Sequence, residues 1–259
     1  MSIPRRFEMS YGFPIDELII ENPHLNLLND NRNLTSIAHL NTQSLLSTFT
    51  EFSSMLTDLQ FDIITLNETW LQDNKEQAKY VEIAGYVPIF KHRKTRGGGV
   101  GLYAKDYLHF QPRKDLTKNS SLEILAAEFR GRNKNTPYLI VTVYQPNFKE
   151  KEKLHWLDLF ETAVAEICTK WNGVIILTGD RNIDLIGQEK ESTIRYKEIL
   201  TSYNLYQHIS KPTRLDKTLI DHIITNIQNK VTHSNVMSTD EISDHDTPCI
   251  LLNIKKERF

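Results

Sequence analysis

The chain has 259 residues, 39% of them hydrophobic and 25% charged, and its formal net charge is −2. These values suit a soluble globular protein with a sizeable core, and the near-neutral charge gives no overall sign of nucleic-acid binding. The sequence shows neither an apolar run of transmembrane length nor a signal-peptide core, so we expect no membrane partner. Cys168 and Cys249 lie in apolar patterns, which favours reduced core thiols and a cytosolic or nuclear compartment.

The first half of the chain begins irregularly and becomes periodic at Leu34. Residues 1–33 are expected to form an extension. Hydrophobic patterns predict strands at 34–41 and 61–67, and a spacing of four and three predicts an amphipathic helix at 44–59. The stretch 96–105 is predicted to form a glycine-rich turn that leads into a strand.

The second half continues the mixture of strands and helices. The predicted elements are strands at 122–130 and 138–144, a helix at 152–171, a strand at 174–179, a helix at 191–203, and short strands at 206–209, 219–225, 231–237 and 247–254. Several neighbouring strands lack a crossover helix, which favours two mixed, largely antiparallel sheets packed face to face with helices outside. No linker interrupts residues 34–254, so we expect one domain at 34–259.

Polar side chains gather at the ends of these predicted strands. They are Asn41, Glu68, Tyr144, Asp180, Asn182, Asp221 and the triplet Ser243-Asp244-His245. Each one alone fits a cap or a surface residue. Together they supply the oxygen ligands and hydrogen-bond donors that a Mg²⁺-dependent phosphoesterase needs.

Six short blocks resemble, in order, those of the endonuclease/exonuclease/phosphatase superfamily. They are "NETWL" (67–71), "RGGGVGLY" (96–103), "VTVYQP" (141–146), "GDRNIDL" (179–185), "KPTR…TLIDHIITN" (211–226) and "SDHDTP" (243–248). They look most like the apurinic-type endonuclease domain of non-LTR retrotransposons of the jockey and CR1 kind. The resemblance covers roughly residues 34–254 and implies a four-layer α/β sandwich.

The resemblance implies a metal set led by Glu68, the principal ligand of Mg²⁺, for which Mn²⁺ is a substitute. Asn41 assists at the metal or the phosphate, and Asp244 supplies a second acid near the metal. Gln43 stands where cellular abasic-site enzymes often have Asp, so the metal set is expected to be leaner here.

The same resemblance implies roles for five further residues. Asp180 orients or deprotonates the attacking water, Asn182 hydrogen-bonds Asp180 or the phosphate, and Tyr144 donates to a phosphate oxygen. His245 stabilises charge on the phosphorus centre, and Asp221 holds the His245 ring. The expected reaction is in-line hydrolysis of a DNA phosphodiester that leaves a 3′-hydroxyl. Whether one or two metals act, and whether His245 or Asp180 is the base, stays open.

The substrate implied by the resemblance is double-stranded DNA. Arg93, Lys94 and Arg96 of the "KHRKTRGGG" loop, together with Thr213, are expected on the DNA. Thr218 replaces an aromatic wall of abasic-site enzymes, which favours nicking of intact DNA. In the family the new 3′-hydroxyl primes reverse transcription, so a reverse transcriptase domain of the same polyprotein is an expected partner, with action in the nucleus after cytoplasmic synthesis. The chain suits an excised domain and a stand-alone enzyme equally.

Two alternatives stay open. One is another enzyme of the superfamily: an abasic-site repair endonuclease, a deadenylase, or a phospholipid or inositol phosphatase. The other is a catalytically impaired domain that only binds nucleic acid or a protein, and this alternative rests on Arg181.

Arg181 stands between Asp180 and Asn182, where the family normally carries Phe or Leu. Strand alternation turns it away from the metal side. It is expected to reach solvent at a shallow strand end, to pair with an acid such as Asp184, or to displace its two neighbours.

Overall fold

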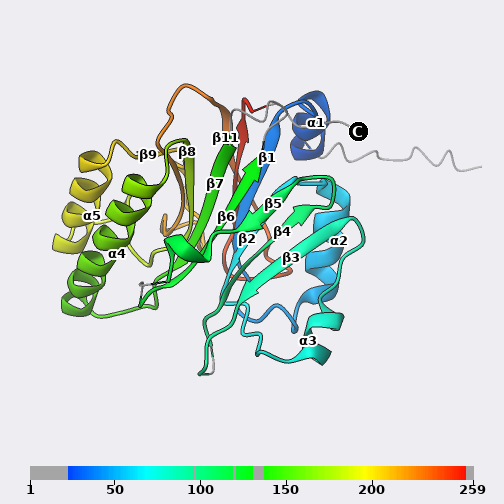
Figure 1. The fold of residues 1–259 in the computed structure, drawn as a ribbon, viewed down its shortest axis with the longest axis horizontal. Coiled ribbons are helices and arrows are strands. Elements are labelled where there is room, and N and C mark those ends of the chain that lie inside the picture. Colours follow the sequence, from blue (N-terminus) through cyan, green and yellow to red (C-terminus); the bar gives the residue numbers. More distant parts are fainter. Residues whose placement is uncertain (1–22, 96, 119–120, 131–136, 255–259) are drawn as a thin grey trace, which may run out of the picture.

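The computed structural model describes residues 23–95, 97–118, 121–130 and 137–254. Two six-stranded sheets lie face to face, and helices cover the outer face of each sheet (Figure 1). The layers follow the order helix, sheet, sheet, helix, which confirms the predicted four-layer α/β sandwich with two mixed sheets.

The first sheet has the strand order β11-β12-β1-β2-β4-β3. Its strands are β1 (Thr35–Asn41), β2 (Ile63–Asn67), β3 (Tyr86–Lys91), β4 (Val100–Lys105), β11 (Val231–Met237) and β12 (Thr247–Leu252). Strands β1 and β2 run parallel, and helix α2 (Phe49–Leu59) makes the crossover between them. The other recorded pairs in this sheet are antiparallel.

The second sheet has the order β5-β6-β7-β8-β10-β9. Its strands are β5 (Phe110–Pro112), β6 (Glu123–Arg130), β7 (Pro137–Tyr144), β8 (Val174–Asp180), β9 (Tyr206–Gln207) and β10 (Asp221–Thr225). Strands β7 and β8 run parallel through the crossover helix α4 (Glu150–Lys170). Helix α5 (Glu191–Ser202) follows β8 and lies beside α4 on the same side of the sheet (Figure 1).

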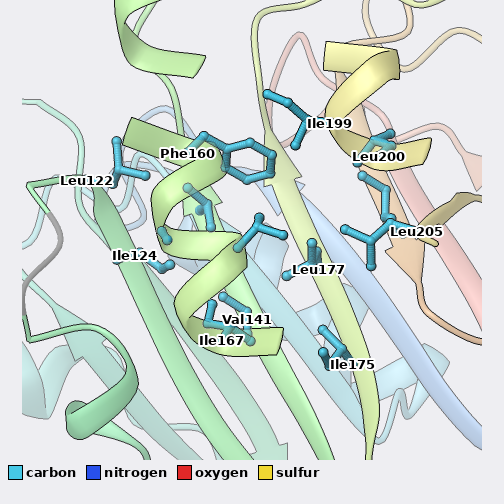
Figure 2. Close-up of a cluster of buried hydrophobic side chains, with 14 of the residues drawn as sticks. Leu122, Ile124, Val141, Phe160, Ile167, Ile175, Leu177, Ile199, Leu200 and Leu205 are labelled. Atoms are coloured by element: carbon cyan, nitrogen blue, oxygen red, sulfur yellow. The ribbon is translucent and has the colours of Figure 1, made fainter. Parts of the chain in front are cut away.

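Helices α4 and α5 are held on the second sheet by an apolar cluster, part of which Figure 2 shows. Phe160 and Ile167 of α4 pack with Val141 of β7 and Leu177 of β8. Burying each side chain of this size contributes roughly 1.5–3 kcal/mol. The outer face of the first sheet is covered by α2, whose Phe52 and Leu56 pack in a second apolar cluster, the α2 cluster.

Most predicted elements occur within a few residues of their expected bounds, with three differences among the described residues. A helix, α1 (Pro23–Asp30), forms inside the predicted extension, where Leu28 packs against the α2 cluster. The predicted helix 44–59 begins only at Phe49, because a turn precedes it. Helix α3 (Lys75–Tyr80), strand β3, strand β5 and a short 3₁₀ turn at Lys114–Leu116 were not predicted.

Between the two sheets, the character of the side chains changes along the strands. Ile37 of β1, Ile63 of β2 and Ile176 of β8 belong to the apolar cluster between the sheets. Two residues further along β1 and β2 lie His39 and Thr65, which are register partners. Two residues further again lie Asn41 and Asn67, and the site is built at this level.

Within the described ranges, none of the helices combines the length and the apolar character that a membrane crossing requires.

Candidate active site

Four inner strands bring buried polar residues to the same edge of the sandwich. Asn41 of β1 is the register partner of Asn67 of β2, and Asp180 of β8 is the partner of Asp221 of β10. All four residues are fully buried. Side chains alternate along a strand, so Asn41 points to the same face of β1 as Ile37. The alternation that places Ile37 in the apolar layer between the sheets therefore also places Asn41 in the polar layer.

Glu68 follows β2 and lies half-buried at this edge. Its φ of +50° turns the chain out of the strand. Its Oε1 accepts hydrogen bonds from Asn41 Nδ2 at 3.0 Å and from the Tyr144 hydroxyl at 2.7 Å, and its Oε2 accepts from Trp70 Nε1 at 3.2 Å. Burial, and then the charge of Glu68, raise the pKa of Tyr144 far above its ordinary value, so the hydroxyl stays a donor at neutral pH.

Asp180 is a fully buried carboxylate of the site. Its Oδ2 accepts from Asn41 Nδ2 at 2.9 Å, and its Oδ1 accepts from the backbone N–H of Asn182 at 2.8 Å. Its own backbone N–H donates to Asn67 Oδ1 at 2.7 Å across the two sheets. Burial, and then the charge of Asp221, raise the pKa of Asp180 to about 7. A carboxylate with such a pKa can exchange a proton with water near neutral pH.

Asp221 and His245 form a hydrogen-bonded pair beside Asp180. His245 Nδ1 lies 2.8 Å from Asp221 Oδ2, and the Thr213 hydroxyl donates to the same oxygen at 2.8 Å. Burial by itself would lower the pKa of His245, but the charge of Asp221 and this hydrogen bond outweigh burial and raise the pKa to about 9. For Asp221 burial acts to raise the pKa, yet the His245 ring outweighs it and holds the pKa below the usual range. The imidazole is therefore a cation at neutral pH, suited to stabilising negative charge.

Thr213 has a different place from the one that the sequence analysis expected. It is fully buried, its hydroxyl bonds Asp221, and that hydroxyl also accepts from the backbone N–H groups of Ile220 and Asp221. The prediction that Thr213 contacts DNA is wrong, because no part of the side chain reaches the surface.

Asp244 is engaged by neighbouring side chains. Arg214 donates to its Oδ2 through Nε at 3.0 Å and through Nη2 at 2.7 Å, and Gln43 Nε2 donates to its Oδ1 at 2.7 Å. These contacts neutralise the charge of Asp244 and use both oxygens. In this arrangement Asp244 orients Arg214 and Gln43 rather than offering a free carboxylate to a cation.

The basic turn between β3 and β4 lies next to the site, and one of its charges is already paired. Arg93 Nε lies 3.4 Å from Glu123 Oε1, while Glu123 Oε2 accepts from the backbone N–H of Gly99 at 2.6 Å. Lys94 is exposed, and Arg96 lies outside the described residues. The turn therefore presents Lys94 to solvent, and Arg93 also ties the turn to β6.

Arg181 is fully buried on the side of β8 that faces away from Asp180. Its guanidinium donates to the carbonyl oxygens of Val143 and Thr178, the latter at 3.0 Å, and lies 5.4 Å from the ring of Phe160 in α4. The structure records no ion pair for Arg181 among the described residues. The accounts in which Arg181 reaches solvent or pairs with Asp184 are therefore wrong.

The residues at this edge fit a divalent cation. Atoms of Asp180, Asp221 and His245 that could act as ligands all lie within 4.8 Å of one another. Since Asp221 and His245 already bond each other, the carboxylates left for a cation are Asp180 and the half-buried Glu68. One amide group, that of Asn41, donates to both. Two like charges drawn together in this way are stabilised by a cation, and carboxylate oxygens are the ligands that Mg²⁺ prefers.

Sequence reasoning missed three residues that build the site: Asn67, Arg214 and His39. Asn67 stands in the quoted "NETWL" block, yet its contact with Asp180 depends on how the two sheets pack. Arg214 stands in the "KPTR" block, beside Thr213, to which the DNA contact was assigned. His39 shares the inner face of β1 with Asn41, and this alternation was the one available signal.

Comparison with known proteins agrees with this geometry. Residues 38–245 match the Endonuclease/Exonuclease/phosphatase family, so the chain belongs to that family. Its members include metal-dependent nucleases and phosphoesterases. No curated protein sequence matches the chain.

Solved structures resemble the chain in fold at low sequence identity. An AP endonuclease from Leishmania major has a TM-score of 0.73 at 12% identity, covering 85% of this chain and 88% of that one. The 3′ phosphatase NExo from Neisseria, bound to a product DNA hairpin, has 0.68 at 18%, covering 85% and 99%. The endonuclease domain of TRAS1, a telomere-specific non-LTR retrotransposon, has 0.64 at 14%, covering 86% and 100%. At these identities the similarity shows the fold alone.

Proposed function

We propose that the chain is a divalent-metal-dependent DNA endonuclease that nicks a phosphodiester and leaves a 3′-hydroxyl. The observation that carries the proposal is the meeting, at one edge, of two carboxylates linked by Asn41 and of a cationic imidazole held by Asp221. Phosphodiester hydrolysis needs both features, because the water must be activated and the charge on the phosphate oxygens must be neutralised.

Each residue has a stated part in this proposal. Glu68, with Asn41 beside it, would hold Mg²⁺, and the cation would supply charge neutralisation at the phosphate. Asp180 takes the proton of the attacking water, for which a pKa near 7 is suited. Asn182 fixes the Asp180 carboxylate through its backbone N–H. His245 donates to a phosphate oxygen, so that its ring faces the developing charge.

The proposal names intact double-stranded DNA as substrate on two grounds. The basic turn offers Lys94 beside the site, where a phosphate backbone would pass. Thr218 offers no aromatic wall for an abasic sugar. We further propose a role in retrotransposition, with the nick priming a reverse transcriptase of the same polyprotein in the nucleus; the TRAS1 endonuclease domain supports this by fold alone.

The test is a plasmid-nicking assay of the full chain with Mg²⁺, with Mn²⁺ and with EDTA, for the parent and for Glu68→Gln and His245→Gln. We expect metal-dependent nicking that is lost in both variants. Glu51→Gln, an exposed change on α2, is the matched control and should nick as the parent does. Extension of the nick by a DNA polymerase would show the 3′-hydroxyl.

Other substrates in the same assay distinguish the alternatives. Faster cleavage of an abasic-site duplex than of intact DNA would favour a repair endonuclease. Release of phosphate from a 3′-phosphorylated oligonucleotide without nicking would favour a phosphatase. DNA binding without any hydrolysis would favour the impaired module and would overturn the proposed enzyme.

A further inference from the structure

His39 is a buried histidine that lies directly behind the Asp221–His245 pair. It occupies the inner face of β1, two residues before Asn41, and its side chain has no exposed surface. Its register partner is Thr65 of β2, whose hydroxyl lies 3.1 Å from His39 Nδ1. His39 thus belongs to the level of the sandwich between the apolar core and the catalytic edge.

Two buried atoms face each other at this level. His39 Nε2 lies 3.6 Å from Asp221 Oδ1. Among the described residues, neither atom has a hydrogen-bond partner. Leaving a buried carboxylate oxygen without a donor costs about 1–3 kcal/mol or more, so a small approach of the ring would be favourable.

The other oxygen of Asp221 is already in use. Oδ2 accepts from Thr213 and contacts the His245 ring, each at 2.8 Å. A carboxylate held at one oxygen alone can pivot about that oxygen, and the direction of its bond to His245 would change with it. A donor on Oδ1 removes this freedom.

We propose that His39 is a positioning residue that donates its Nε2–H to Asp221 Oδ1 and so fixes the direction in which Asp221 holds His245. The proposal rests on the proposed function for its kinetic consequence, but its structural part does not. The Thr65 hydroxyl has one hydrogen and two acceptors within reach, His39 Nδ1 at 3.1 Å and the carbonyl oxygen of Ala38 at 3.2 Å. In the proposal this hydrogen goes to Nδ1, which leaves the ring hydrogen on Nε2 for Asp221 Oδ1. Asp221 is then held by three groups, from Thr213, His245 and His39.

The structural test is NMR of the imidazole N–H protons in the metal-free full chain. A proton shared between His245 Nδ1 and Asp221 is expected far downfield, and His245→Gln identifies it by its loss. We expect His39→Leu to shift and broaden this resonance. In His39→Gln, whose amide can donate toward Oδ1, the resonance should lie close to its position in the parent. Thr65→Val removes the Nδ1 partner and the hydroxyl contact with the Ala38 carbonyl but keeps the imidazole, so it should shift the resonance in the same direction by a smaller amount. This variant replaces His39→Leu in the test if His39→Leu does not fold.

The matched control is His222→Gln. His222 is equally buried and is next to Asp221 in sequence, but it is on the opposite face of β10, bonded to the Tyr196 hydroxyl at 3.0 Å. This variant also loses the stability that a buried imidazole contributes, but it leaves the surroundings of Asp221 Oδ1 unchanged. The His245 resonance should therefore stay in place.

The kinetic readout uses the nicking assay. We expect His39→Leu to lower kcat by about 10- to 100-fold with KM nearly unchanged, the usual cost of losing an outer partner of a site residue, and His39→Gln to recover most of it. An unmoved His245 resonance in both His39→Leu and Thr65→Val would overturn the positioning role, whether or not the parent nicks DNA. A parent that does not nick, with the resonance shifted as expected, would instead overturn the proposed function and leave the positioning role supported.

Discussion

At the scale of single residues, Arg181 shows how a charge can be accommodated behind a strand of the candidate site. Two backbone carbonyls accept from its guanidinium, and the face of Phe160 lies 5.4 Å from it. Burial lowers the pKa of Arg181, so the charge is costly even with these contacts. Asp180 and Asn182 nevertheless keep their 2.8 Å hydrogen bond, so the buried guanidinium does not pull the pair apart.

The first prediction concerns Arg181→Phe. Removing a buried charge that has no acidic partner should raise the free energy of unfolding by about 1–2 kcal/mol, as often happens when buried ions are replaced by apolar groups of similar size. The nicking rate should change by no more than a few-fold, because Asp180 is already well held. Urea unfolding and the nicking assay measure the two effects. A large gain in nicking would instead show that Arg181 impairs the site.

The second prediction concerns Asp180→Asn. Because the pKa of Asp180 is raised to about 7 in the folded state, the folded protein binds this proton more tightly than the unfolded chain does. The stability of the parent should therefore fall as the pH rises from about 4 to about 7 on account of this group. In EDTA at pH 8 the variant should be more stable by about 1–3 kcal/mol, and the difference should shrink as the pH falls below 7.

Thermal and urea unfolding across this pH range provide the measurement, and Asp58→Asn, an exposed change on α2, is the control. The variant should lose nicking. A pH-independent difference in stability would contradict the raised pKa.

At the scale of elements, the basic turn between β3 and β4 joins the two sheets at the edge of the site. Glu123, at the start of β6, holds Arg93 by its charge and Gly99 by its backbone N–H. Gly99 has a φ of +89°, and an added Cβ would lie 2.7 Å from Thr69 Oγ1, so only glycine fits there. The glycine run thus serves close packing next to Glu68, and the exposed Lys94 is the residue of this turn that we propose to contact the DNA backbone.

The third prediction concerns Lys94→Ala. If Lys94 contacts a phosphate, its loss should weaken DNA binding to all sequences alike and reduce the slope of log K against log salt by about 1. Fluorescence anisotropy over a salt series measures this. Lys197→Ala, on the outer helix α5, removes the same charge and should leave the slope unchanged. Equal effects of both substitutions would point to a general charge effect and would contradict a contact.

At the scale of the whole molecule, the site exists only because two sheets pack on each other. Asn41 and Asn67 belong to the first sheet, and Asp180 belongs to the second. Asn41 donates to the Asp180 carboxylate, and the Asp180 backbone N–H donates to Asn67, so both hydrogen bonds cross between the sheets. Gly179 adopts φ +135°, and a side chain there would overlap the carbonyl of Val143. Folding brings the carboxylates of Asp180 and Glu68 close together, and the favourable packing of the rest of the fold offsets their repulsion. A bound cation would reduce this repulsion and stabilise the folded state.

The fourth prediction is that Mg²⁺ stabilises the protein. The temperature of unfolding should rise with Mg²⁺ concentration, because a ligand that binds only the folded state stabilises it by mass action. The rise should be much smaller in Glu68→Gln. Calorimetry with Mg²⁺ and with Ca²⁺ would check it, and an equal rise in both proteins would place the cation elsewhere.

The sequence by itself determined which residues face the space between the sheets. Period-two alternation places Asn41 with Ile37 and Asp180 with Ile176, and helical spacing places Phe160 and Ile167 on one side of α4, because these periodicities are local properties of the chain. The pairing of Asp221 with His245 came from family resemblance and not from periodicity.

Only the tertiary structure decided which distant polar atoms meet. Asp244 bonds Arg214, Thr213 turns inward to Asp221, His39 faces Asp221 Oδ1, and Arg181 lies under Phe160. All of these contacts except Thr213 with Asp221, which spans eight residues, join segments far apart in the chain. Whether a side chain is exposed or enclosed there depends on the packing of both sheets and their helices. Local spacing carries no information about that packing, so these parts of the site had to be seen in the fold.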